Sequence, residues 1–172
     1  MSGKRIRGNG IFLNDKRNKL FKEFVRIIND LKPKIFLMEN VPGILNIFQG
    51  KTKNQILSIF ESIGYDAKVK VLLAADYGVP QLRKRAFFIG NNLGIDPEFL
   101  FPPKINKDYI TVEDAIFDLP FIKSGEGKFE TIYKKKPSTE YQKKMRAGVK
   151  KLYNHISTKH DDKIINIIKM LK

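Results

Sequence analysis

Two short motifs supply a carboxylate and two guanidiniums, which together could act on a polar heterocycle. The first is Glu39-Asn40-Val41, which ends an apolar run, and the second is Gln81-Leu82-Arg83-Lys84-Arg85. A carboxylic acid can donate a proton or a hydrogen bond, and a guanidinium can stabilise negative charge on a nearby oxygen. Arg83 and Arg85 begin an expected strand, so alternation places them on one face, where they would suit a phosphate or a flipped base.

The segment before Glu39 predicts a strand. The apolar run from Lys34 to Met38 lies between a proline and Pro42-Gly43, as is typical of a strand buried on both faces of a parallel sheet. Glu39 would then lie at the carboxyl end of this strand, where ligand-binding groups collect in open α/β sheets.

The remaining pattern predicts α/β architecture. Apolar spacing predicts helices over residues 16–31, with Asp15 as N-cap, and around residues 56–63, closed by Gly64. Strands are expected over 67–73 and 85–89. Beyond Pro102-Pro103, a short helix over 111–119, a loop over 124–127 and a helix over 164–171 are expected.

Composition indicates a globular chain with a polyanionic partner. The 172 residues are 42% hydrophobic with 13 Phe and carry a net charge of +15. Residues 123–172 hold 14 basic and 5 acidic side chains, more than half of the excess. There is no cysteine, which excludes thiol nucleophiles and disulfides within this sequence. Without an apolar run of membrane-spanning length or a signal-like N-terminus, we expect a cytoplasmic protein and no membrane partner.

Four motifs in this order resemble the DNA cytosine-5 methyltransferase family. They are Ser2-Gly3-Lys4-Arg5, Asp15-Lys16-Arg17-Asn18-Lys19-Leu20, Glu39-Asn40-Val41-Pro42-Gly43 and Ala75-Asp76-Tyr77-Gly78-Val79-Pro80-Gln81-Leu82-Arg83-Lys84-Arg85. The last motif, at this distance after Glu39 and before a strand, is highly specific. The resemblance implies an incomplete Rossmann-like, S-adenosylmethionine-dependent methyltransferase domain. Residues 1–122 would be the distal half of the catalytic domain, and residues 123–172 a basic, partly helical extension toward a target-recognition region.

The resemblance also implies roles for individual residues. In the family a cysteine thiolate adds to C6 of cytosine, so that C5 can accept a methyl group while charge develops toward N3 and O2. Glu39 would serve N3 as an acid, which calls for a dry pocket, and Arg85, with Arg83 beside it, would stabilise O2. DNA contacts are implied for the following residues: Ser2, Lys4, Arg5, Gln81, Arg83 and Arg85.

The chain departs from the family in what it lacks. The Phe-x-Gly-x-Gly cofactor loop, the acidic residue for the ribose and the Pro-Cys nucleophile do not occur. S-adenosylmethionine is therefore expected as methyl donor in the complete enzyme, and this chain alone is not expected to bind it. We expect a middle slice of the domain whose sheet has an exposed edge.

Other features are weaker. Ser124-Gly125-Glu126-Gly127-Lys128 lacks the pattern of a phosphate loop, and His155 and His160 are five residues apart, which argues against a shared metal site on a helix. No metal is expected, and His155 is expected to be structural. The Lys134-Lys135-Lys136 run fits a DNA-backbone contact and a solvated loop equally well.

Three interpretations remain open at this point. The chain is a fragment or subunit of a methyltransferase, inactive alone and completed by a second chain that carries the cofactor loop and the cysteine. Alternatively it is a non-catalytic basic module that binds double-stranded DNA, or a nonfunctional gene remnant. A restriction-modification context follows from the first interpretation.

Overall fold

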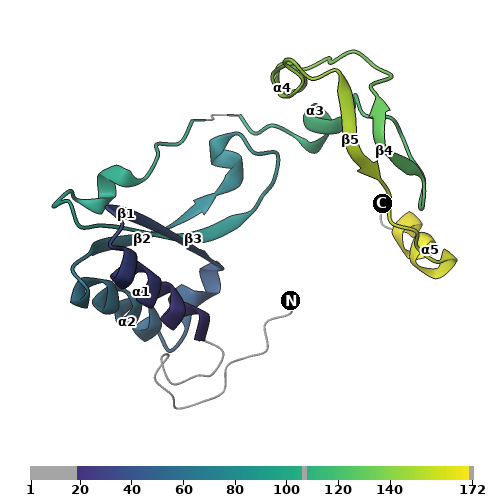
Figure 1. Ribbon diagram of the computed structural model, residues 1–172. Helices are drawn as coiled ribbons and strands as arrows, with labels where there is room; N and C mark the ends of the chain where they lie inside the picture. The colour runs from purple at the N-terminus through teal and green to yellow at the C-terminus, as the bar shows by residue number, and fades with distance from the viewer. Residues whose placement is uncertain (1–18, 106–107, 171–172) are drawn as a thin grey trace. The chain divides into compact units, whose positions relative to one another are not determined.

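The computed structural model describes residues 19–105 and 108–170, which fall into two compact units that divide between Lys107 and Asp108. The first unit holds the following elements: α1 (Lys19–Leu31), β1 (Ile35–Asn40), α2 (Lys51–Ser62), β2 (Asp66–Leu73) and β3 (Lys84–Asn91), with 3-10 turns η3 (Pro42–Asn46), η4 (Ala74–Tyr77) and η5 (Pro97–Leu100) (Figure 1). The architecture is mixed α/β, as expected, and the predicted strands and helices of this unit are present.

The three strands form one sheet in the order β1-β3-β2, with β3 antiparallel to both neighbours. β1 and β2 run in the same direction, connected through α2, but they do not touch. The expectation of a parallel sheet is therefore wrong for the described residues. The cause is the connection over residues 74–83, because so short a link returns the chain antiparallel beside β2.

The strand β1 forms one edge of this sheet and is covered on one face. Phe36 is buried, whereas its neighbours Ile35 and Leu37 are 47% and 56% exposed. Both helices of the unit, α1 and α2, lie on the Phe36 face (Figure 1). The prediction that β1 is buried on both faces is wrong. No described element covers β1 on the face that carries Ile35 and Leu37.

The core lies between the two helices and the sheet. Phe60 of α2 is fully buried, and its ring centroid lies 4.4 Å from that of Phe36 and 5.9 Å from that of Phe21 on α1. Phe36 also lies over Gly90, its partner on β3, where an added Cβ would come within 2.3 Å of the ring. Glycine at position 90 therefore lets the aromatic ring pack onto the sheet.

The second unit consists of these elements: α3 (Val112–Ile116), β4 (Gly127–Ile132), α4 (Glu140–Met145), β5 (Lys151–Ile156) and α5 (Asp162–Met170). The antiparallel pair β4–β5 and the helix α4 are additions to the predicted elements. We expected a boundary at residue 122, but α3 belongs to the second unit because Thr139 Oγ1 donates a hydrogen bond to the carbonyl of Asp114 at 2.8 Å.

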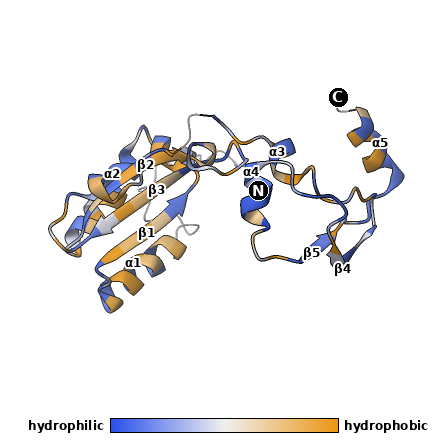
Figure 2. Ribbon diagram, turned by 90° about the horizontal axis from the view of Figure 1, so that it is seen from above, coloured by the Kyte–Doolittle hydropathy of each residue, from blue (hydrophilic) through white to orange (hydrophobic). Residues whose placement is uncertain are grey.

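Hydropathy differs between the two units. Figure 2 shows β1 and β3 largely in hydrophobic colours, whereas α4 and the β4–β5 pair are mainly hydrophilic. Leu152 is the buried apolar residue of β5, and α5 contributes no buried residue. Among the described helices, none is long and apolar enough to cross a membrane.

Candidate active site

Glu39 meets both predicted arginines. Its Oε1 lies 2.9 Å from Arg85 Nε and 3.4 Å from Arg83 Nη2. Sheet register explains the meeting, since Glu39 pairs with Phe87 and the antiparallel β3 starts beside the carboxyl end of β1. Residues far apart in sequence are therefore held together by the strands β1 and β3.

The two arginines differ in how firmly they are held. Arg85 lies within β3, its side chain is 24% exposed, and Nη1 donates to the carbonyl of Lys84 at 2.8 Å. Arg83 precedes the strand and its side chain is 47% exposed. Its carbonyl accepts a hydrogen bond from the amide of Ala74, which ties the loop to the end of β2. Arg85 is thus the better-ordered cation beside Glu39.

The Glu39 carboxyl is partly exposed to solvent within the described residues. The Glu39 side chain is 46% exposed, so the expected dry pocket is not formed by the described residues. The physical reason is the edge position of β1, whose outer face has no cover at Ile35 and Leu37. A dry environment for this carboxyl would need additional polypeptide or a bound ligand over that face.

The other sequence-predicted residues fall into three groups. Gln81 lies exposed in the tight turn before β3, where its amide donates a hydrogen bond to the carbonyl of Val79. The Oδ1 of Asn40 accepts a hydrogen bond from the amide of Val41 at 2.8 Å, which braces the turn after Glu39. Ser2, Lys4 and Arg5 lie outside the described residues.

The possible metal ligands of the described residues are not gathered into one site. No group of three or more His, Asp or Glu side chains with metal-binding geometry occurs within residues 19–105 and 108–170. His155 Nε2 lies 2.7 Å from the carbonyl oxygen of Pro120, which is the structural role expected for it.

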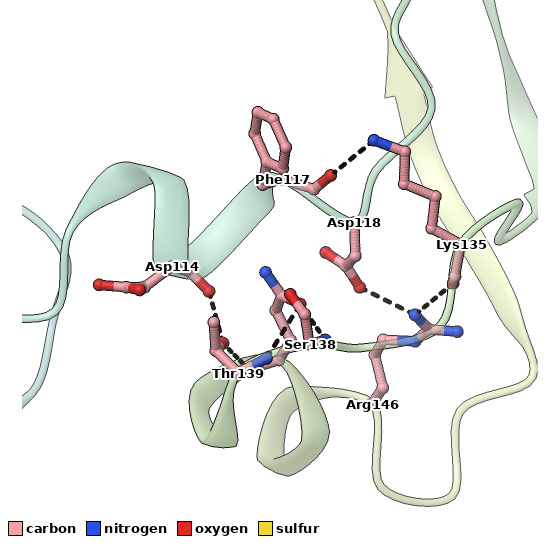
Figure 3. A network of polar contacts seen from close by, with 8 residues as sticks. Asp114, Phe117, Asp118, Lys135, Ser138, Thr139 and Arg146 are labelled. Carbon is pink, nitrogen blue, oxygen red and sulfur yellow. Dashed lines mark hydrogen bonds and ion pairs between the residues drawn. The ribbon is translucent and has the colours of Figure 1, made fainter.

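A second polar cluster was missed by sequence reasoning. In the second unit, Arg146 Nη1 lies 2.9 Å from Asp118 Oδ2 and donates to the carbonyl of Lys135, also at 2.9 Å (Figure 3). The guanidinium stacks 3.8 Å from the ring centroid of Tyr133. The sequence signal that could have revealed the supporting helix is Thr139-x-x-Gln142, a capping box at the start of α4.

A family model described as "C-5 cytosine-specific DNA methylase" matches residues 7–171. The chain is 40% identical over 168 residues to the type II methyltransferase M.DdeI of Desulfomicrobium norvegicum, covering 92% of this chain and 40% of that protein. It is 49% identical over 115 residues to the type II methyltransferase M1.HphI of Haemophilus parahaemolyticus, covering 67% of this chain and 30% of that protein.

The fold has a counterpart among solved structures. A prophage-encoded protein of E. coli, assigned as a DNA modification methyltransferase, matches with a TM-score of 0.65 and 28% identity. The match covers 89% of this chain and 50% of the other. The chain thus spans half or less of the length of these relatives.

Proposed function

The chain belongs to the C-5 cytosine-specific DNA methylase family, and we propose that it forms the base-handling part of a DNA (cytosine-5-)-methyltransferase. The observation that carries this proposal is the contact of Glu39 with Arg85 and Arg83 at the meeting of β1 and β3. A carboxyl and a guanidinium held side by side match the N3 and O2 edge of a cytosine taken out of the helix.

In this proposal Glu39 and Arg85 act on one base. Glu39, as the acid, donates a hydrogen bond or a proton to N3, while the Arg85 guanidinium donates to O2. Negative charge that develops on the ring when C6 is attacked is then stabilised at both atoms. Entry of the base would replace the Arg85–Glu39 ion pair with contacts from each side chain to the base.

Arg83 and Gln81 are assigned to DNA, and Arg83 is also proposed to assist Arg85 at the reacting base. Both are exposed in the turn before β3, next to the site, and Arg83 also reaches Glu39. A guanidinium in this position suits a phosphate beside the flipped nucleotide. Ser2, Lys4 and Arg5 keep the same proposed role.

The remaining parts of the reaction are assigned to polypeptide outside this sequence. The chain contains no cysteine, and the open edge and face of β1 are consistent with one part of a larger Rossmann-like sheet. S-adenosylmethionine supplies the methyl group in a complete enzyme of this kind. Residues 1–122 would serve catalysis, and residues 123–172 would extend toward target recognition.

A chimera tests this function directly. The 168-residue matching segment of M.DdeI is replaced by this chain, and the hybrid is expressed in cells without cytosine methylation. Bisulfite sequencing of plasmid DNA then reports 5-methylcytosine. We expect methylation from the hybrid and none from the same hybrid with Glu39→Ala.

The opposite outcome has a clear meaning. A soluble hybrid that binds duplex DNA but leaves every cytosine unmethylated would contradict the proposed function. A Glu39→Ala hybrid that methylates as well as its parent would contradict the role of this carboxyl. Circular dichroism of the purified hybrids separates these outcomes from misfolding.

A further inference from the structure

The second unit gathers lysines from three segments of the chain at one end of the β4–β5 pair. Lys134, Lys135 and Lys136 follow the end of β4, and Lys150 immediately precedes β5. Ile132 and Lys151 are partners in the register, so the end of β4 and the start of β5 are adjacent. The lysines that follow β4 and the lysine that precedes β5 therefore lie at the same end of the strand pair.

The helix α4 adds the third segment. Arg146, just after α4, donates to the carbonyl of Lys135, which joins the lysine run to the helix end (Figure 3). Lys143 and Lys144 lie in the last turn of α4, directly before this junction. The Arg146 contact thus joins the lysine run to the end of α4, and the pairing of Ile132 with Lys151 places Lys150 at the same end of the β4–β5 pair.

Asp118 and Arg146, which we call the anchor, are largely buried and pair with each other. Asp118 is 3% exposed and Arg146 18%, and the Arg146 guanidinium also covers Tyr133. Lys135 lies over the ring of Phe117, 4.7 Å from its centroid, and donates to the Phe117 carbonyl. The Lys135 side chain is therefore held against Phe117, and its backbone carbonyl is held by Arg146. Lys134 and Lys136, on either side of Lys135, are exposed.

Within the described residues, some exposed lysines of this end have acidic partners and others do not. Glu140 pairs with Lys143, Glu130 pairs with Lys151, and Asp118 is taken by Arg146. Apart from Lys135, whose side chain contacts Phe117, four exposed lysines of this end form no ion pair within the described residues: Lys134, Lys136, Lys144 and Lys150. We call these four the lysine cluster. Like charges held together on a fixed backbone favour a polyanion with regularly spaced charges.

We propose that the lysine cluster binds the phosphate backbone of double-stranded DNA, separately from the base-handling site at Glu39. The identity of the partner rests on the proposed function, while the location rests on the arrangement of the second unit. Lysine contacts to phosphates carry no base information, so this surface contributes affinity and orientation rather than target choice.

The test compares two fourfold variants of the whole chain that lose the same charge. The cluster variant is K134Q/K136Q/K144Q/K150Q. The control variant is K123Q/K159Q/K163Q/K169Q, which removes four exposed lysines from the same unit, near or beyond the opposite end of the β4–β5 pair. Binding to a fluorescent 24-base-pair duplex is measured by anisotropy at several salt concentrations.

The cluster variant should raise the Kd at least tenfold at low salt. It should also reduce the slope of log affinity against log salt by about 3.6, since each of the four lost phosphate contacts contributes about 0.9. The control variant should raise the Kd less than threefold. Equal losses in the two variants, or no binding of the duplex by the unaltered chain, would overturn the proposal.

Two further arms distinguish charge from fold and DNA from other polyanions. A K134R/K136R/K144R/K150R variant keeps the charges and should bind as the unaltered chain does, and a loss equal to that of the Gln variant would refute the proposal. A duplex RNA or phosphatidylserine vesicles bound more tightly than DNA, with the same dependence on the cluster, would reject DNA as the ligand. These binding experiments do not measure methyl transfer. The proposed function is tested by the chimera, so either proposal can fail while the other holds.

Discussion

Glu39 Oε1 and Arg85 Nε lie 2.9 Å apart, at the point where the carboxyl end of β1 meets the start of β3. Neither strand alone provides the pair, because it depends on β3 returning antiparallel beside β1. Arg85 is the less exposed of the two arginines that reach Glu39 and is held by the Lys84 carbonyl. Arg85 is therefore proposed to be the arginine that contacts the reacting base most closely.

Substitution of Arg85 should lower methyl transfer more than DNA binding. In the M.DdeI chimera, Arg85→Ala should reduce the rate about 10²- to 10³-fold, as is typical when a donor to a developing charge is removed. Arg85→Lys should lie in between, because an ammonium keeps the charge but not the planar fork. Lys84→Ala, which alters the neighbouring residue on the opposite face, should change the rate less than threefold. Equal rates for Arg85→Ala and Lys84→Ala would contradict the assignment.

Phe60 should dominate the stability of the first unit. It is fully buried among rings from α1 and β1, so Phe60→Ala should lower the free energy of unfolding by about 3 to 5 kcal/mol. Phe99, which is 81% exposed, offers a matched control whose change to Ala should cost less than about 0.5 kcal/mol. Urea unfolding followed by circular dichroism measures both. Similar values for the two variants would show that the core is elsewhere.

The Asp118–Arg146 pair should hold the second unit together. Asp118→Asn leaves a largely buried guanidinium without its counter-ion, which typically costs about 3 to 5 kcal/mol. Glu140→Gln breaks an exposed pair with Lys143 and should cost less than about 0.5 kcal/mol. Amide hydrogen exchange should accelerate in α4 and β5 for Asp118→Asn and remain unchanged in α1. Unchanged exchange in α4 would argue against this anchor.

Asp96 should make the first unit sensitive to acid. The hydrogen bond from Lys68 Nζ, followed by one from the Glu98 amide, lowers the pKa of Asp96 below its ordinary value. A carboxyl whose pKa is lower in the folded state stabilises the fold above its unfolded pKa of about 4, and this contribution is lost as pH falls through the folded pKa.

The check compares the urea midpoints of the unaltered chain and Asp96→Asn between pH 6 and pH 3. The variant should be the less stable protein at pH 6, and the difference should shrink below about pH 4. A difference that stays constant across this range would show that the Lys68–Asp96 contact does not contribute through charge.

The first unit was largely predictable because its signals are strong. Apolar residues of α1 recur at helical spacing, and the runs before Glu39 and after Arg85 are typical strands. Pairing direction was not predictable in the same way. A buried apolar run fits a parallel and an antiparallel neighbour equally. The exposure of one face of β1 was also not predictable, because it results from the absence of a covering element among the described residues.

The second unit was poorly predicted for a different reason. The strands β4 and β5 contain few buried apolar residues, with Leu152 the buried one in β5, so alternation gives little signal. Their arrangement depends on polar anchors that are distant in sequence, such as Asp118 with Arg146. The helix α3 lies within the predicted range 111–119, and the structure shows a local capping box of Thr111 and Asp114 at its start.

The most direct test of the central claim is a double-mutant cycle of methyl transfer with Glu39→Gln, Arg85→Ala and the two together in the chimera. If both side chains act on one cytosine, each single variant should lose about 10²-fold or more, and the double variant should lose far less than the product of the two losses. Multiplicative losses would mean that the residues act independently. Single losses below threefold would contradict the account outright.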